Sequence, residues 1–166
     1  MLKKILCLVL CALLALLLPI APALALSPLS VELYAGGHFS FAVPEGWAAE
    51  EREDGLLVFT SPEESQLAGM LLTVEELDVS DYAPFDTSDL YAGIAASLGG
   101  EGTAVPVDGH SASLVETTSE TGCLCTVLYC RGTTVLAMSA TAPEADAAAA
   151  RTLLLNMVRY TAYLGA

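Results

Sequence analysis

The sequence predicts an α+β fold, a central antiparallel sheet of about six or seven strands with helices packed on its faces. Three observations predict it. Short segments alternate apolar and polar residues with the period of two that is typical of half-buried strands. Asp-Gly and Arg-Gly pairs join neighbouring segments, as expected for hairpins. Only two stretches, near residues 86–98 and 141–161, have the period of an amphipathic helix, and such helices bury their apolar faces against a sheet.

The start of the chain has the layout of a secretory signal peptide. Lys3 and Lys4 form a short basic segment, and residues 5–18 are an unbroken apolar run. Pro19 and Pro22 then interrupt the run, and small residues follow where cleavage is expected. An uncleaved membrane anchor would need about 20 consecutive apolar residues, and the prolines end this run before that length.

A lipid anchor on Cys11 is also disfavoured, because Leu10 stands where a small residue is required and the apolar run continues beyond it. We therefore expect cleavage after Ala25. This gives a signal peptide over residues 1–25, a single domain over residues 26–166, and a secreted protein without a membrane attachment beyond the export signal.

The expected mature chain is strongly acidic. Both lysines leave with the leader, so four arginines remain against 20 acidic residues, a net charge of −16. Such a surface repels phosphate backbones and anionic lipid headgroups. Nucleic acid and membrane surfaces are therefore excluded as partners, and an unidentified protein or small ligand is expected instead.

The first strands are expected before residue 44. Residues 31–34 predict a short edge strand, and Gly36 begins a turn. Phe39, Phe41 and Val43 then alternate with smaller or polar residues, which predicts a half-buried strand.

A structural corner follows, in which Pro44 and Gly46 turn the chain and Trp47 opens the next strand. The Asp-Gly pair at residues 54–55 predicts a type I′ hairpin corner that returns the chain through residues 56–60. We interpret Trp47 as a large ring that closes one end of the sheet.

After a strand over residues 69–77, the first helix is expected to begin at Asp86, Thr87 or Ser88 and to end at Gly99, where glycine adopts the left-handed conformation without penalty. Its apolar stripe consists of Leu90, Tyr91, Ile94, Ala95 and Leu98.

Two further hairpins are predicted from four strands. Residues 103–107 and 111–117 meet at Asp108-Gly109, and residues 123–130 and 133–140 meet at Arg131-Gly132. The last helix is expected to start with a capping box formed by Thr141 and Glu144. Its buried line consists of Ala150, Leu153, Leu154, Met157, Val158 and Thr161.

The order of these parts resembles the PsbP-like superfamily, the extrinsic photosystem II proteins and their bacterial secreted relatives. The motifs are "VPEGW" at residues 43–47 and "VDGHSASLVE" at residues 107–116, followed by the Arg131-Gly132 hairpin and a C-terminal helix. The resemblance covers the expected mature chain and implies an α/β/α sandwich. It also implies a non-catalytic binding, assembly or accessory role, and no functional residue is carried over.

The mature chain has three cysteines, Cys123, Cys125 and Cys130, and an odd number in a secreted protein indicates a free thiol or an intermolecular bond. Cys123 and Cys125 lie two apart in a strand and so face the same side, with poor geometry for a mutual disulfide, whereas Cys130 faces the other side. Buried cysteine is the simplest interpretation, but a monomer and a disulfide-linked dimer both remain open.

Metal sites and catalytic motifs have little support. His38 or His110 could in principle bind zinc together with Cys123 and Cys125, but the spacing is not that of a zinc site. The acidic residues 50–54 lack the spacing of a calcium loop. No Gly-x-Ser-x-Gly elbow or phosphate-binding loop is present. We expect neither a cofactor nor a metal.

The sequence therefore favours a secreted, non-catalytic binding or accessory protein with an unidentified ligand or partner. The alternative is a surface-assembly protein linked through an unpaired cysteine. An uncharacterised enzyme is the third hypothesis.

Overall fold

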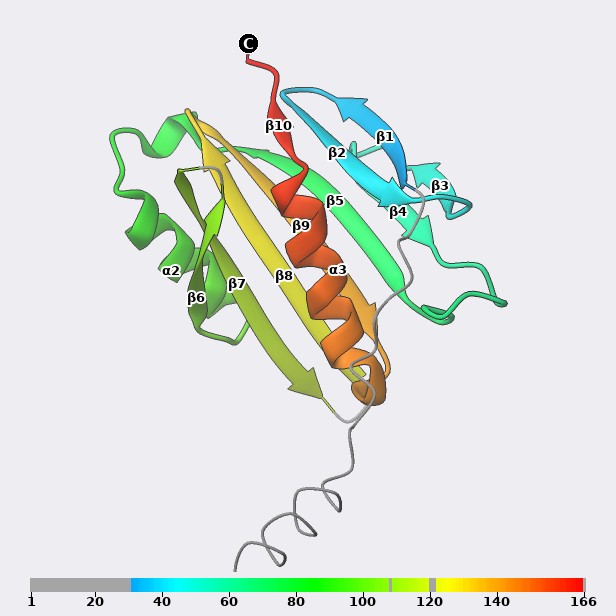
Figure 1. Ribbon diagram of the computed structural model, residues 1–166. Helices are drawn as coiled ribbons and strands as arrows, with labels where there is room; N and C mark the ends of the chain where they lie inside the picture. Colours follow the sequence, from blue (N-terminus) through cyan, green and yellow to red (C-terminus); the bar gives the residue numbers. More distant parts are fainter. Residues whose placement is uncertain (1–30, 108, 120–121, 166) are drawn as a thin grey trace, which may run out of the picture.

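The computed structural model describes residues 31–107, 109–119 and 122–165. The expected signal peptide over residues 1–25 and the hairpin residue Asp108 lie outside the described residues. Within them, the chain forms ten strands in two antiparallel sheets, two α-helices and two short 3₁₀ helices (Figure 1). The predicted α+β class and the helices on the faces of a central sheet are confirmed.

The larger sheet has seven strands and forms the centre of the molecule (Figure 1). In spatial order its strands are β3 (Ala48–Glu51), β4 (Leu57–Thr60), β5 (Leu71–Asp78), β9 (Thr134–Ala142), β8 (Gly122–Arg131), β7 (His110–Ser119) and β6 (Gly102–Val107). A second sheet consists of β1 (Val31–Gly36), β2 (Phe39–Pro44) and β10 (Ala162–Tyr163), with β2 in the middle.

Two helices lie on opposite faces of the large sheet, α2 (Thr87–Ser97) and α3 (Ala147–Arg159), each preceded by a 3₁₀ turn, η1 (Ser80–Tyr82) or η2 (Glu144–Asp146). Alternate residues of β8 show the two faces, because Val127 packs in the core beneath α3 while Leu128 packs in the core beneath α2. The three-stranded sheet shares the α3 face. The molecule is thus an α/β/α sandwich in which one outer layer contains both α3 and the three-stranded sheet.

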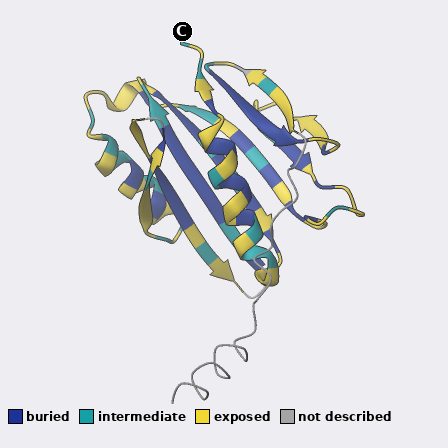
Figure 2. Cartoon of the chain, viewed as in Figure 1, coloured by how far each residue is buried: buried dark blue, intermediate teal, exposed yellow. Residues whose placement is uncertain are grey.

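The core on the α3 side is rich in aromatic rings, and buried residues run along the central strands (Figure 2). The Phe39 ring lies 6.0 Å from that of Tyr129 and 5.2 Å from that of Tyr163. Phe41 meets the edge of Phe59 at 6.3 Å. Each such fully buried side chain stabilises the fold by about 1.5–3 kcal/mol. These contacts hold the small sheet against the large one.

Helix α2 begins and ends where the sequence predicts. The Asp86 carboxylate accepts a hydrogen bond from the Ser88 amide at 2.7 Å and so caps the helix. At the other end, Gly99 has φ +78°, and the amide of Gly100 donates to the carbonyl of Ala95 at 3.1 Å. This is the glycine stop expected from residues 99–100.

The Tyr91 hydroxyl attaches α2 to the sheet. It donates to the carbonyl of Ser111 at 3.1 Å and accepts from the amide of Cys130 at 2.7 Å. Burial raises the pKa of Tyr91 to about 12. The hydroxyl therefore stays protonated over the whole physiological range and acts as a structural donor.

The predicted capping box of the last helix is wrong. Thr141 belongs to β9, where it pairs with Leu71 on one side and Leu124 on the other. The strand ladders occupy the backbone there, so no helix can begin at this point. Helix α3 starts after η2, and its N-cap Asp146 makes no side-chain cap bond. The buried line of α3 is as predicted, with Ala150, Leu153, Leu154, Met157 and Val158 buried in the helix and Thr161 buried just beyond it.

Two strand predictions also need correction. Every residue of β2 is buried, including Ser40 and Ala42, which the period of two assigned to solvent. As the central strand of its sheet, β2 has a neighbour on each side, and its small side chains are shielded. The Asp-Gly corner is not a two-residue turn either, because β3 ends at Glu51 and β4 begins at Leu57.

Replacement of Trp47 tests the corner between the two sheets. The Trp47 side chain is 7% exposed and belongs to the core on the α3 side. We expect Trp47→Ala to lower the free energy of unfolding by about 3–5 kcal/mol, because truncation leaves a cavity. Urea unfolding would measure this loss. The matched control is Tyr160→Ala, whose ring is 72% exposed, and an equal loss in both variants would contradict the assignment.

Candidate functional site

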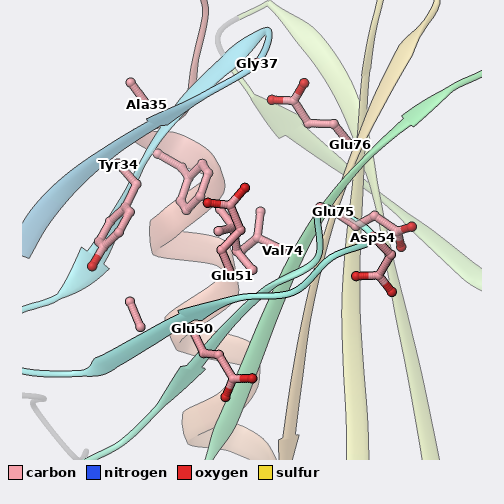
Figure 3. Close-up of a pocket in the computed structure, with 13 residues that line it drawn as sticks. Tyr34, Ala35, Gly37, Glu50, Glu51, Asp54, Val74, Glu75 and Glu76 are labelled. Atoms are coloured by element: carbon pink, nitrogen blue, oxygen red, sulfur yellow. The ribbon is translucent and has the colours of Figure 1, made fainter.

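A cleft opens between the small sheet and the end of the β3–β4 hairpin, with a volume of about 530 Å³ (Figure 3). Its walls come from three places in the chain: the β1–β2 hairpin, the β3–β4 hairpin with its loop, and the second half of β5. The lining residues are Tyr34, Ala35, Gly37, Phe41, Ala49, Glu50, Glu51, Asp54, Gly55, Leu57, Val74, Glu75 and Glu76. The smaller hollows described, of about 160 and 110 Å³, lie elsewhere.

The cleft exists because β4 is shorter than β5. Strand β4 begins at Leu57, opposite Val74, whereas β5 continues to Asp78. The loop over residues 52–56 is closed on itself instead of continuing the ladder. Its Arg52 amide donates to the Leu56 carbonyl at 3.0 Å, and the carboxylate of Asp54 accepts from the Leu56 amide at 3.2 Å.

Glu76 on β5 holds the β1–β2 hairpin over the large sheet. Its carboxylate accepts hydrogen bonds from the amides of His38, at 2.9 and 3.1 Å, and Phe39, at 3.1 Å. The His38 ring nitrogen Nδ1 lies 3.1 Å from the same carboxylate. The turn residue Gly37 has φ +59°, and a Cβ there would collide with the Glu76 side chain. We call this arrangement the Glu76 clamp.

One wall of the cleft is aromatic and apolar. The Tyr34 ring stacks on Phe41 with centroids 6.1 Å apart and meets the edge of Phe59 at 4.8 Å. Leu57 and Val74 complete this wall. Figure 3 shows Tyr34 on the small sheet with Glu51 and Val74 on the strands of the large sheet.

Five acidic residues line the cleft, Glu50, Glu51, Asp54, Glu75 and Glu76, and we call their side chains the cleft carboxylates. Figure 3 shows that Glu51 points toward the small sheet, whereas Glu50 points away from it. Across the described residues, only two pairs of groups lie within salt-bridge distance. One is His38 with Glu76, which is an ion pair only when the imidazole is protonated, and the other is Arg151 with Glu116, at 3.7 Å and away from the cleft. Four of the cleft carboxylates thus have no cationic partner in that part of the chain. The potential in the cleft is strongly negative.

The histidines and the acidic segment do not form a metal centre. His38 belongs to the Glu76 clamp, and His110 is exposed at the start of β7. Glu50, Glu51 and Asp54 of the segment considered for calcium do reach the cleft. Nevertheless, no group of three His, Cys, Asp or Glu side chains in the described residues is placed to hold a metal ion.

The three cysteines are free thiols within the sheet. Cys123 and Cys125 face α3 and are buried, 3.8 Å from the Pro143 carbonyl and 4.0 Å from the Ala147 carbonyl respectively. Cys130 packs on the α2 side and is half-buried, as its opposite parity predicts. None lies at the cleft, and the structure gives no support to a disulfide or to a linked dimer.

The corner residues Pro44, Gly46 and Trp47 serve the fold and not the cleft. Pro44 pairs with Val31 at the end of β2, Gly46 has φ +81°, and the Trp47 ring is buried in the core. These residues connect the two sheets.

The sequence interpretation missed Glu76 and Tyr34. Glu75-Glu76 is one of several acidic pairs in the sequence, and such pairs usually lie on a solvated face. The period of two along β5 nevertheless places Glu76 on the same face as the buried Leu72 and Val74. An acid on the apolar face of a strand is a signal that a partner lies above it. The partner is a pair of backbone amides, 38 and 37 residues away, and it leaves no pattern in the sequence.

No family model and no curated protein matches the chain. Solved structures do match it, and they define its class, the PsbP-like fold. The solution structure of cyanobacterial PsbP (CyanoP) from Synechocystis sp. PCC 6803 has a TM-score of 0.61 and 14% identity, covering 87% of this chain and 99% of that one. The Saccharomyces cerevisiae Ran-binding protein Mog1p has a TM-score of 0.57 and 18% identity, with coverages of 82% and 96%.

A longer protein from Bacteroides thetaiotaomicron also matches, with a TM-score of 0.54 and 12% identity over 80% of this chain and 47% of that one. At these identities the likeness establishes the fold alone. The predicted resemblance to PsbP-like proteins is thereby supported at the level of architecture. Among the described residues, no helix has the length and apolarity to cross a membrane.

Removal of the Glu76 clamp should destabilise the protein. Glu76→Ala leaves the amides of His38 and Phe39 without their acceptor, so we expect a loss of about 1–3 kcal/mol in the free energy of unfolding. Chemical unfolding would measure it. Glu75→Ala is the matched control, because the Glu75 carboxylate is exposed and accepts no such bonds. Its effect on the free energy of unfolding should stay within about 0.5 kcal/mol. Equal losses in the two variants would refute the clamp.

Thiol labelling tests the environment of the cysteines. Burial, reinforced by the adjacent Cys123, raises the pKa of Cys125 to about 11, and burial also raises the pKa of Cys130. Because the thiolate is the reactive form, native protein at pH 8 should react slowly with an aromatic disulfide reagent, and the rate should increase as the pH rises toward 11.

In the form beginning at residue 26, denaturant should make all three thiols reactive. Cys130→Ser should remove most of the slow native reaction, because only Cys130 is partly exposed. Rapid native reaction of Cys123 or Cys125 would contradict the buried placement.

Proposed function

We propose that this chain is a secreted, non-catalytic binding or accessory protein whose partner binds in the cleft between the small sheet and the β3–β4 hairpin. The observation that carries the proposal is the cleft, since a volume of about 530 Å³ lies within the usual range of ligand sites, about 300–1,000 Å³. Its mixed lining, an aromatic wall facing carboxylates, is suited to recognition.

The lining residues support binding in preference to catalysis. They include no serine, threonine, cysteine, lysine or histidine, so no nucleophile of those types stands beside a base. His38 is not among the lining residues, and its ring nitrogen Nδ1 lies 3.1 Å from the Glu76 carboxylate. The fold likeness agrees with a binding role, because one of the similar solved structures, Mog1p, is a Ran-binding protein.

Secretion is the part of the proposal that depends on sequence alone. The basic start, the apolar run and the small residues before residue 26 support it. Without residues 1–25 the chain has no lysine and a net charge of −16, which is compatible with an extracellular medium.

Site-specific photo-cross-linking tests the proposal. Benzoylphenylalanine would replace Ala35 or Ala49, exposed residues of the cleft, in the native host. The matched controls are Ala92 on α2 and Ala148 on α3, which are exposed alanines away from it. We expect adducts from the culture medium or cell surface at the two cleft positions only. Adducts at the helix positions without any at the cleft would overturn the proposed site.

A further inference from the structure

We infer that the cleft binds an extended, lysine- or arginine-bearing segment of a partner protein, which adds to the free edge of β3. This inference rests on the proposed function and names the chemistry of its partner. It is carried by the strand edge that borders the cleft, by the aromatic wall opposite, and by the complementary charge.

The cleft runs along an edge of the large sheet. Ala49, Glu50 and Glu51 are consecutive in β3, and all three line the cleft. Strand β3 is the outermost strand of this sheet, so a hollow that its residues line reaches the edge of the sheet. Within the described part of the chain, β3 pairs with β4 alone, so its outer backbone groups are available to a further strand.

The other edge of the same sheet is built differently. Strand β6 carries Pro106, which has no amide hydrogen to donate and is typical of protected edges. Strand β3 has no proline and is protected by charge instead, through Glu50 and Glu51. A charged edge repels a strand of the same sign and accepts one of the opposite sign.

Charge also decides between a second copy and a different partner. Pairing of β3 with β3 of another molecule would place Glu50 and Glu51 of both copies on neighbouring strands, where their like charges repel. Four cleft carboxylates lack an ion pair in the described residues, which leaves the site uncompensated. A basic segment supplies the missing positive charge.

The aromatic wall suits the side chains of such a segment. Lysine and arginine lay their aliphatic stems along apolar surface and keep the charged end among acids. Tyr34, half-buried on β1, offers a ring face or edge to a cation, while the half-buried Leu57 offers apolar surface to the stem. The alternation of a strand places every second side chain toward this wall.

The test measures binding of fluorescent octapeptides to the full secreted protein by anisotropy. The probe alternates lysine and threonine, with blocked ends. One comparison peptide replaces lysine with glutamate, and another keeps the lysines but carries N-methyl groups at alternate peptide bonds, so that it cannot pair as a strand. We expect binding of the lysine peptide only, weakened by salt because exposed charges are screened.

Two variants with the same change in charge locate the site. Glu50→Gln with Glu51→Gln should weaken the lysine peptide roughly tenfold, about 1.4 kcal/mol. Glu63→Gln with Glu64→Gln, on the exposed loop after β4, should change it less than about twofold. Circular dichroism and urea unfolding of both variants would verify that each is folded.

Three outcomes overturn the inference: equal weakening by both variants, equal binding of the N-methylated peptide, or no binding of the lysine peptide. Adducts at Ala35 and Ala49 with a partner segment that contains no lysine or arginine would also overturn it while leaving the proposed function intact. Absence of any cleft adduct would instead count against the proposed function itself.

Discussion

A single α-helix cannot cover one face of a seven-stranded sheet, and the remaining architecture follows from that constraint. Seven strands at about 4.8 Å spacing are close to 30 Å wide, whereas a helix with its side chains is about 10–12 Å across. Helix α3 packs mainly on β8 and β9. The apolar faces of β4 and β5 would therefore remain exposed, and the small sheet covers them with Phe39, Phe41 and Val43.

Covering a sheet with another sheet leaves a seam, and the seam explains the cleft. The two sheets meet through rings in the middle, but at the end of β5 the contact is polar and consists of the Glu76 clamp. There β4 has not yet begun, so a gap remains between Gly37 and Leu57. The site is thus a consequence of unequal strand lengths and does not interrupt the core. Apart from Glu76 and the aromatic wall, the residues that line the cleft do not belong to the buried core.

Buried polar groups and surface charges lie in different parts of this molecule. The Tyr91 hydroxyl and the thiols of Cys125 and Cys130 lie inside the sheet layers, where burial raises the pKa of each, and they serve packing. The charged groups that remain available are almost all carboxylates at the surface, and the cleft gathers five of them. The surface of a protein of this composition therefore carries mainly negative charge, because the chain has few lysines and arginines.

Most of the fold could be predicted from the sequence because its signals are local. The hairpin ends at Gly109 and Gly132, the Asp86 cap and the stop at residues 99–100 each depend on a few neighbouring residues. The prediction of a capping box at Thr141 was wrong for the opposite reason. Thr141 is paired with strands on both sides, so its backbone is not free to begin a helix. The two-sided burial of β2 and the five-residue loop before Leu57 were also decided by distant partners.

The fold class, the order of the elements, the acidic surface and the faces on which Cys123 and Cys130 lie all follow from the sequence alone, since periodicity and composition are properties of the chain. Packing in three dimensions decided that a second sheet would form and that Tyr34, Glu51 and Glu76 would meet at one cleft. These residues come from three strands, and nothing local links them. The physical reason is that a binding site is made by distances between segments, which only packing establishes.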